Sequence, residues 1–182
     1  MAGEIQLNGT SFASESSGTI TVNNGTLGSS VVFPAGHILQ LIHASKSSNT
    51  TINTTSSFMD AGLNTGTITQ KQSGSKFLIQ TTATTAPTGY TSSYRREIFV
   101  GWNTSNTGVY TGISALRIGR GAGSANDVDS SHNPSGTASY LITAPSSSFT
   151  IYLTAQAIHD TAGNYIGGGN YKTEIIVMEL AQ

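Results

Sequence analysis

The sequence predicts an all-β fold, an antiparallel β-sandwich preceded by an extended N-terminal arm. Its apolar residues come in short runs bounded by Gly, Ser, Asn and Thr, the pattern of strands joined by turns. No stretch of about eleven residues carries the 3.6-residue period of an amphipathic helix. Roughly nine to eleven runs, spaced by about 8–15 residues, favour a sandwich over alternating strand–helix units.

The first predicted element is the arm, residues 1–36. Residues 7–30 are mostly Ser, Thr, Gly and Asn, and Asn-Gly pairs at Asn8 and Asn24 predict turns. We expect one or two short strands, among them Thr19–Val22. A segment this polar cannot form a core by itself. We therefore expect it to become ordered against a partner. The isolated apolar residues expected to dock on that partner are Leu7, Phe12, Ile20, Val22 and Leu27.

The remaining elements form a compact domain over residues 37–182. Phe149, Ile151 and Leu153 share one face of a predicted strand. Near the C-terminus, Ile176, Met178 and Leu180 lie opposite Ile175, Val177 and Glu179. After a short run at Val31–Phe33, the predicted strands are His37–Ala44, Thr50–Met59, Thr67–Gln70, Lys76–Thr82, Glu97–Trp102, Ala115–Gly119, Ala138–Ala144, Phe149–Ala157 and Tyr171–Leu180.

Low charge excludes several classes of protein. Charged residues make up 9% of the chain, against about 25% in average proteins, and the net charge is −1. Eight cations supply little for nucleic-acid binding, and the longest apolar run is too short to cross a membrane.

With no cysteine, there is no disulfide framework or zinc–thiolate site. The N-terminal residues lack the pattern of a secretory signal, so we do not expect secretion.

The same low charge bears on the sheet edges. Monomeric sandwiches protect edge strands with charged side chains, especially Lys, or with Pro. This chain has four Pro, and its last predicted strand carries only Lys172, Glu174 and Glu179 as charged residues. We therefore expect copies of the chain to cover one another's edges in a homo-oligomer.

Few residue patterns point to catalysis or metal binding. His37 and His43 lie on the same face of one predicted strand, together with Leu39 and Leu41. Because six strand residues span about 20 Å, one chain cannot bring both histidines to one metal ion. Asp127, Asp129 and His132 lie in a Gly/Ser/Asn-rich loop without the spacing of an EF-hand. Gly119 to Gly123 lacks the full nucleotide-binding fingerprint, and no nucleophile or zinc-protease motif occurs. We expect no enzyme activity, no cofactor and no metal.

One cationic and aromatic stretch is a candidate ligand surface. Arginine and tyrosine side chains can bind sugars or anionic surfaces, and the candidate contacts are Tyr94, Arg95, Arg96, Tyr110 and Arg120. The competing interpretation is packing within the core or between subunits. Trp102 closes a predicted strand and is expected to be buried.

Five segments between residues 34 and 180 form a recognisable set. They are Pro34-Ala35-Gly36-His37-Ile38-Leu39-Gln40, Ser57-Phe58-Met59-Asp60, Thr67-Ile68-Thr69, Gly74-Ser75-Lys76-Phe77-Leu78-Ile79 and Ile175-Ile176-Val177-Met178-Glu179-Leu180. In these segments the chain resembles a family of β-domains at the C-terminal ends of virion and fibre structural proteins of marine tailed phages, and the similarity covers residues 34–182. The resemblance implies a jelly-roll-like sandwich used in fibres and surface appendages, commonly as a homotrimer.

The resemblance implies a non-enzymatic virion structural protein, assembled in the host cytoplasm. It would be a short fibre or surface appendage, attached to capsid, collar or tail proteins through the arm and able to touch a host-surface glycan. A capsid decoration protein is one alternative. A carbohydrate-binding or depolymerising module is another, based on the arginine and tyrosine stretch. We expect no nucleic-acid partner and no membrane insertion.

Overall fold

The chain folds into two compact units, Met1–Phe33 and Pro34–Gln182. A computed structural model describes residues 34–85, 96–110, 115–120, 135–158, 164–167 and 172–182, together with three N-terminal strands. Only the backbone is described for those three strands and for residues 96, 97, 119 and 120. The division between the units falls three residues before the boundary expected from the sequence.

The N-terminal unit contains a three-stranded antiparallel sheet in the order β1-β2-β3. The strands are β1 (Gly3–Leu7), β2 (Thr10–Ser16) and β3 (Thr19–Val22). Leu7 pairs with Thr10 across Asn8-Gly9, where a turn was expected. The expectation of one or two strands was too low, because β1 and β2 lack clear apolar alternation. The second predicted turn, at Asn24, and the predicted strand Val31–Phe33 lie outside the described residues.

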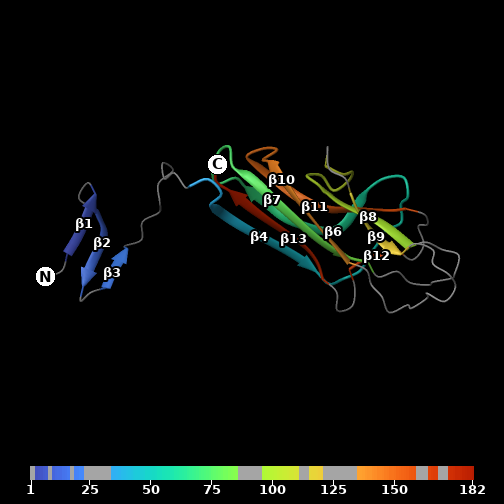
Figure 1. Cartoon of the computed structure of the whole chain (residues 1–182), viewed down its shortest axis with the longest axis horizontal. Helices are drawn as coiled ribbons and strands as arrows, with labels where there is room; N and C mark the ends of the chain where they lie inside the picture. The colour runs from blue at the N-terminus through green and yellow to red at the C-terminus, as the bar shows by residue number, and fades with distance from the viewer. Residues whose placement is uncertain are drawn as a thin grey trace. The chain divides into compact units, whose positions relative to one another are not determined.

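The compact unit is an antiparallel jelly-roll sandwich (Figure 1). Its strands are β4 (Ile38–Lys46), β5 (Thr50–Thr51), β6 (Met59–Thr69), β7 (Lys76–Thr84), β8 (Arg96–Asn103), β9 (Leu116–Arg120), β10 (Ser135–Thr143), β11 (Ser148–Ala157), β12 (Tyr165–Ile166) and β13 (Thr173–Leu180). One sheet has the order β10-β7-β13-β4 and the other β6-β11-β8-β9. Among the described residues the two sheets contain eight strands, which can be numbered one to eight in chain order from β4 to β13, leaving out the short β5 and β12. In these numbers the first sheet has the order 6-3-8-1 and the second the order 2-7-4-5, which is the strand order of a jelly roll. This order confirms the predicted fold class.

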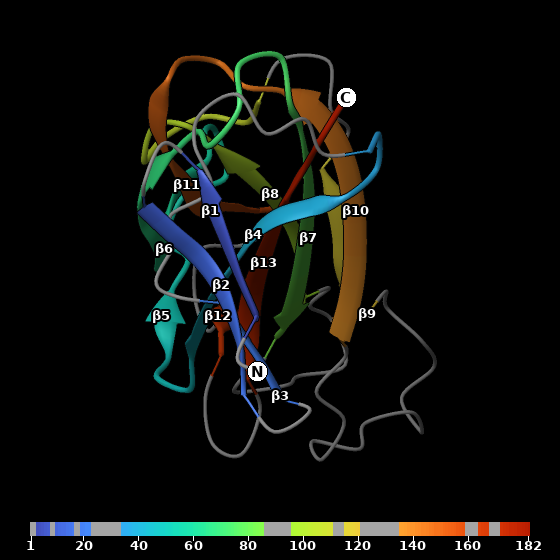
Figure 2. The ribbon, with the colours of Figure 1, turned by 90° about the vertical axis from the view of Figure 1, so that its left-hand side faces the viewer.

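The two sheets pack face to face over one apolar core. Figure 2 shows the ribbon turned by 90° from the view of Figure 1. Phe149, Ile151 and Leu153 all point into the core, as their alternation predicted. The Phe77 and Phe149 rings meet edge to face at 5.0 Å, one from each sheet. Among the described residues there is no helix with the length and apolar character that a membrane crossing requires.

The region from Thr50 to Thr69 differs from the prediction. Only two residues pair as β5, and one long strand, β6, replaces the short predicted strand Thr67–Gln70. Gly62 and Gly66 have φ angles of +74° and +69°, and their N–H groups donate to Asp60 (2.6 Å) and Asn64 (2.9 Å). The β6–β11 register shifts twice along this stretch. These Gly and Asn residues were expected to lie between two predicted strands, but they form irregularities inside one continuing strand.

Candidate functional site

A row of large apolar side chains crosses the outer face of the sheet β10-β7-β13-β4. Met178 on β13 pairs with Leu41 on β4 and with Leu78 on β7, and Leu78 pairs with Leu141 on β10. Because register partners in adjacent strands point to the same side, these four side chains line up from one sheet edge to the other. Leu41 and Leu141, at the two ends of the row, are each 60% exposed.

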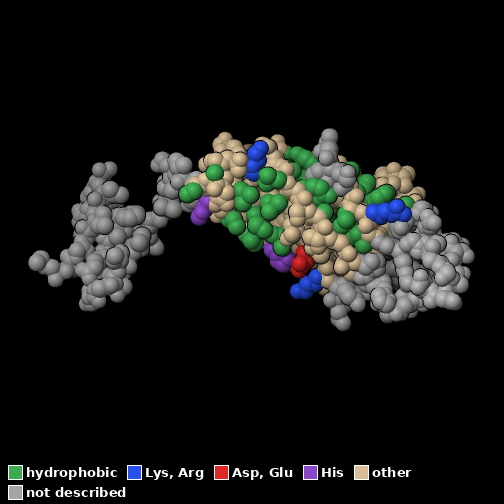
Figure 3. Space-filling model, viewed as in Figure 1, with side chains coloured by type: hydrophobic (Ala, Val, Ile, Leu, Met, Phe, Trp, Pro, Cys, Tyr) green, Lys and Arg blue, Asp and Glu red, His purple; other side chains and the backbone are tan. Residues whose placement is uncertain are grey.

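Further apolar side chains extend the row along the strands. Ile38 is 50% exposed and pairs with half-buried Leu180, while Ile176 lies two residues from Met178 on the same face. Figure 3 shows hydrophobic side chains gathered over this sheet. We call this set the outer apolar face, and it consists of Ile38, Leu41, Leu78, Leu141, Ile176, Met178 and Leu180. Contiguous exposed apolar side chains of this kind mark interaction surfaces.

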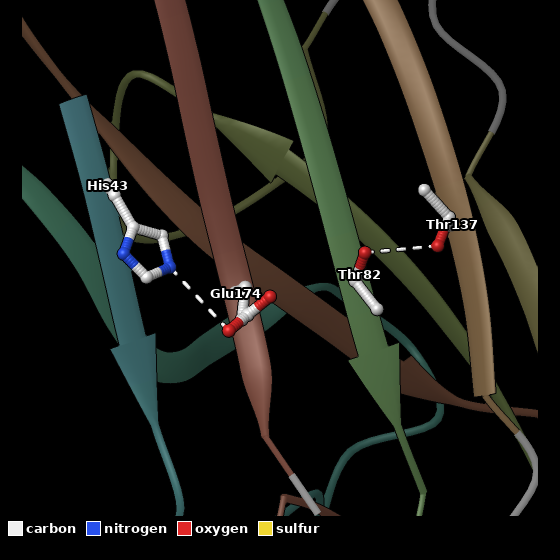
Figure 4. A network of polar contacts seen from close by, with 4 residues as sticks. All are labelled: His43, Thr82, Thr137 and Glu174. Carbon is white, nitrogen blue, oxygen red and sulfur yellow. Dashed lines mark hydrogen bonds and ion pairs between the residues drawn. The ribbon is translucent and has the colours of Figure 1, made fainter. Parts of the chain in front are cut away.

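Polar side chains on the same sheet face are bonded to one another. Figure 4 shows His43 Nε2 facing Glu174 Oε1 at 3.6 Å, and the hydroxyls of Thr82 and Thr137 at 3.0 Å. Each pair links neighbouring strands. Two more cross-strand bonds join Gln80 Nε2 to Ser139 Oγ (3.3 Å) and Lys76 Nζ to Thr143 Oγ1 (2.7 Å). The polar atoms named here therefore have partners within the face itself.

A buried carboxylate lies on the core side of the same sheet. Glu179 is fully buried, and its oxygens accept hydrogen bonds from Ser75 Oγ (2.6 Å), Lys71 N–H (2.9 Å), Gln72 N–H (3.0 Å) and Gln40 Nε2 (2.5 Å). Burial alone would raise the pKa of Glu179, but these hydrogen bonds together hold it below the usual value of 4.5. Glu179 therefore joins the 70–75 turn to β13 and β4.

This finding corrects the interpretation of the C-terminal strand. Glu179 was counted among the charges that could protect a sheet edge. Instead β13 lies between β7 and β4, and Glu179 points into the core. The sequence showed that Glu179 alternates with Ile175 and Val177, and this parity was the available signal that the three share one face.

The edge strands of this sheet carry little charge that faces outward. β10 contains no Lys, Arg, Asp, Glu or Pro, and among the described strands only β7 pairs with it. On β4, the Lys46 ammonium donates to Thr50 Oγ1 and to the Ala61 carbonyl (2.5 Å). Partial burial lowers the pKa of Lys46, with a smaller opposing effect of Asp60. Neither strand has the outward lysine that typically protects an edge.

The outer face of the other sheet differs, because the chain covers part of it. A Cβ placed on Gly101 of β8 would lie 2.8 Å from a Val109 methyl and 3.6 Å from the Phe58 ring. The Gly108 N–H donates to the Phe58 carbonyl at 3.2 Å, which joins the two covering segments. The two outer faces are therefore not equivalent.

The predicted ligand residues are only partly brought together. Arg96 and Arg120 are register partners in β8 and β9, so their Cα atoms are adjacent across the strands. Tyr110 is half-buried, and its ring stacks on fully buried Trp102 at 4.6 Å and 22°. Trp102 is buried as predicted, and Tyr110 has the packing role that was the competing interpretation. Tyr94 and Arg95 lie outside the described residues, as does Leu27.

The predicted docking residues Leu7, Phe12, Ile20 and Val22 all fall on the strands β1 to β3 of the N-terminal unit. Their side chains are not among those described, so their docking role stays a prediction.

The histidines give no metal site in the described part of the chain. β4 begins at Ile38, after His37, and its pairing with β13 shifts between Ile38 and Gln40. The prediction that His37, Leu39, Leu41 and His43 alternate on one strand face is therefore wrong at its start. The described residues contain no group of three His, Asp or Glu side chains placed to hold an ion. The loop that contains Asp127, Asp129 and His132 lies outside those residues.

The chain matches no known protein-family model and no curated protein.

Proposed function

We propose that this chain is a non-enzymatic structural protein of a tailed-phage particle, incorporated as a homotrimer. The observation that carries the proposal is the outer apolar face, a row of large side chains that crosses a whole sheet with Leu41 and Leu141 each 60% exposed. A protein that works alone rarely leaves such a face open, whereas a component of an assembly buries it.

Two further features support assembly. β10 is an edge strand without any charged residue, and edges of this kind pair or become covered. The jelly roll is among the folds used by viral capsid domains, although fold alone does not assign function. The phage assignment itself depends on the resemblance of residues 34–182 to virion and fibre proteins.

In this proposal the two units have separate tasks. The compact unit, Pro34–Gln182, forms the trimer, and the N-terminal unit, Met1–Phe33, attaches it to a capsid, collar or tail protein. The particle would display the compact unit as a short fibre or surface appendage that can reach the host surface.

Immunogold labelling of purified phage particles tests the proposal. An antibody against residues 34–182 should label intact particles, and mass spectrometry should detect the chain in the same preparation. Label at the tail or collar would support the appendage, and label spread over the capsid would support a decoration protein. Particles that contain no detectable copy of the chain would contradict the proposal.

A further inference from the structure

We propose that the outer apolar face of the sheet β10-β7-β13-β4 is the surface through which copies of this chain pack against one another. The inference rests on the proposed homotrimer and specifies the residues that form it. The other sheet is a weaker candidate, because Phe58 and Val109 cover part of its outer face.

The face has the size of a protein interface. Four strands about 4.8 Å apart, each about eight residues long at about 3.3 Å per residue, give a flat area of roughly 500 Å². A standard stable interface buries about 800 Å² of accessible surface on each partner. Side chains that protrude expose more area than the sheet beneath them, so the two quantities are comparable. The centre of the face is apolar and its flanks are polar, as in the interior and rim of such interfaces.

The charges of the face favour an identical copy over a charged partner. Within its strands the ionisable side chains are His43, Lys76 and Glu174, each with a neighbour in the sheet, and exposed Lys172 directly precedes β13. A nucleic acid or an anionic membrane needs clustered lysine or arginine, and these two lysines lie at opposite ends of the paired strands β7 and β13 and form no cluster. A second copy brings the same apolar row and no cluster of like charges. Since the cross-strand polar pairs are already formed, covering them leaves fewer donors and acceptors without partners.

The distribution of exposure favours neighbours on both sides. Within the row, Leu78 and Met178 in the middle are half-buried, whereas Leu41 and Leu141 on the two edge strands are the most exposed. Around a threefold axis each copy would place its Leu141 edge against the Leu41 edge of the next copy. This head-to-tail arrangement closes after three copies and covers the charge-free edge of β10.

A pair of charge variants tests the surface. In Leu41→Glu/Leu141→Glu, two carboxylates replace the most exposed ends of the row. The control, Asn106→Glu/Ser147→Glu, adds the same charge at exposed positions away from the row. Light scattering should give the trimer mass for the unmodified chain and the control, and the monomer mass for the Leu variant, with circular dichroism unchanged. A Leu variant with the same mass as the unmodified chain would overturn the inference.

A labelling experiment provides a second readout that does not depend on destabilising the interface. The chain has no cysteine, so Leu141→Cys and Ser147→Cys each introduce a single thiol. In the assembled protein, maleimide should label Leu141→Cys several-fold more slowly than Ser147→Cys, and dilution to monomer should remove the difference. Equal labelling rates in the assembled protein would contradict the inference. Rapid labelling of Leu141→Cys after deletion of residues 1–33, with the number of chains in the assembly unchanged, would also contradict it, since the N-terminal unit would then be the cover.

The outcomes separate this inference from the proposed function. A trimer that survives the Leu substitutions, found in labelled particles, would leave the function standing and reject the surface. A monomeric Leu variant of a chain that is absent from particles would support the surface and reject the virion role. An unmodified chain that is dimeric, with a monomeric Leu variant, would support the surface and contradict the threefold arrangement.

Discussion

Met178 and Glu179 are consecutive residues of β13 that lie on opposite faces of the sheet, with the thioether side chain outside and the carboxylate in the core. Met178 pairs with Leu41 and Leu78 in the outer apolar face. Glu179 is fully buried and hydrogen-bonded. In a sandwich strand with one solvated face, the apolar residue normally points inward and the charged one outward. This inversion shows that β13 has two structured faces, one holding the core together and one presenting apolar side chains.

The first prediction concerns the buried carboxylate. Glu179→Gln keeps the shape but places an NH₂ group against N–H and NH₂ donors that now bond to oxygen. We expect the free energy of unfolding in urea at pH 7 to fall by about 2–3 kcal/mol. The control Glu174→Gln, on the partly exposed outer face, should change it by less than about 0.5 kcal/mol. Equal effects of the two substitutions would show that the hydrogen bonds to Glu179 contribute little.

The second prediction follows from the pKa of Glu179. Because the pKa in the folded protein lies below the usual 4.5, ionised Glu179 stabilises the fold above that pH. Its contribution is lost as pH falls through the folded pKa. Urea unfolding of the unmodified chain should therefore show a steeper loss of stability below pH 4.5 than unfolding of Glu179→Gln. Parallel pH profiles would contradict the assigned cause of the shift.

The third prediction tests the close approach of the two sheets at β10 and β9. A Cβ on Gly136 would lie 2.7 Å from Leu116 Cδ2 and 3.2 Å from Ile118 Cγ1. Gly136→Ala should therefore lower the free energy of unfolding by about 1–3 kcal/mol through overpacking. Ser139→Ala, on the exposed face of the same strand, serves as control and should be close to neutral. An unchanged or raised melting temperature for Gly136→Ala would show that Leu116 moves aside without cost.

The fourth prediction separates the two units. Residues 34–182 form a compact unit with its own core, so deletion of residues 1–33 should leave a cooperative thermal transition. If the N-terminal unit attaches the protein to the particle, the truncated chain should be absent from particles assembled beside it. Immunoblots of purified particles, with the full chain as control, measure this. Normal incorporation of the truncated chain would place the attachment surface on the jelly roll.

Strand alternation made much of the fold predictable. The spacing of Phe149, Ile151 and Leu153 predicted their buried face correctly, and the bounds of β3 and β11 agree within one residue with the predicted strands. The path of β6 could not be predicted, because Asp60 and Asn64 stabilise left-handed glycines inside a strand, while in sequence the same residues are typical of turns.

The outer apolar face was not predicted, and its cause is tertiary. Leu41, Leu78, Leu141 and Met178 come from four segments far apart in the chain, and only strand pairing brings them into one row. Parity separated Met178 from Glu179, but it did not tell which side would be buried. An apolar residue on both sides of a strand is ambiguous until the sheet order is known. The buried environment of Glu179 likewise depends on a turn over one hundred residues away.

The mass of the unmodified full chain in solution, measured by multi-angle light scattering at micromolar concentration, tests the central claim of assembly through the sheet most directly. One chain has a mass of 18.8 kDa. We predict a single species of three times that mass, stable on moderate dilution. A species of 18.8 kDa at every concentration would contradict it, because the outer apolar face would then remain open to water in the isolated protein.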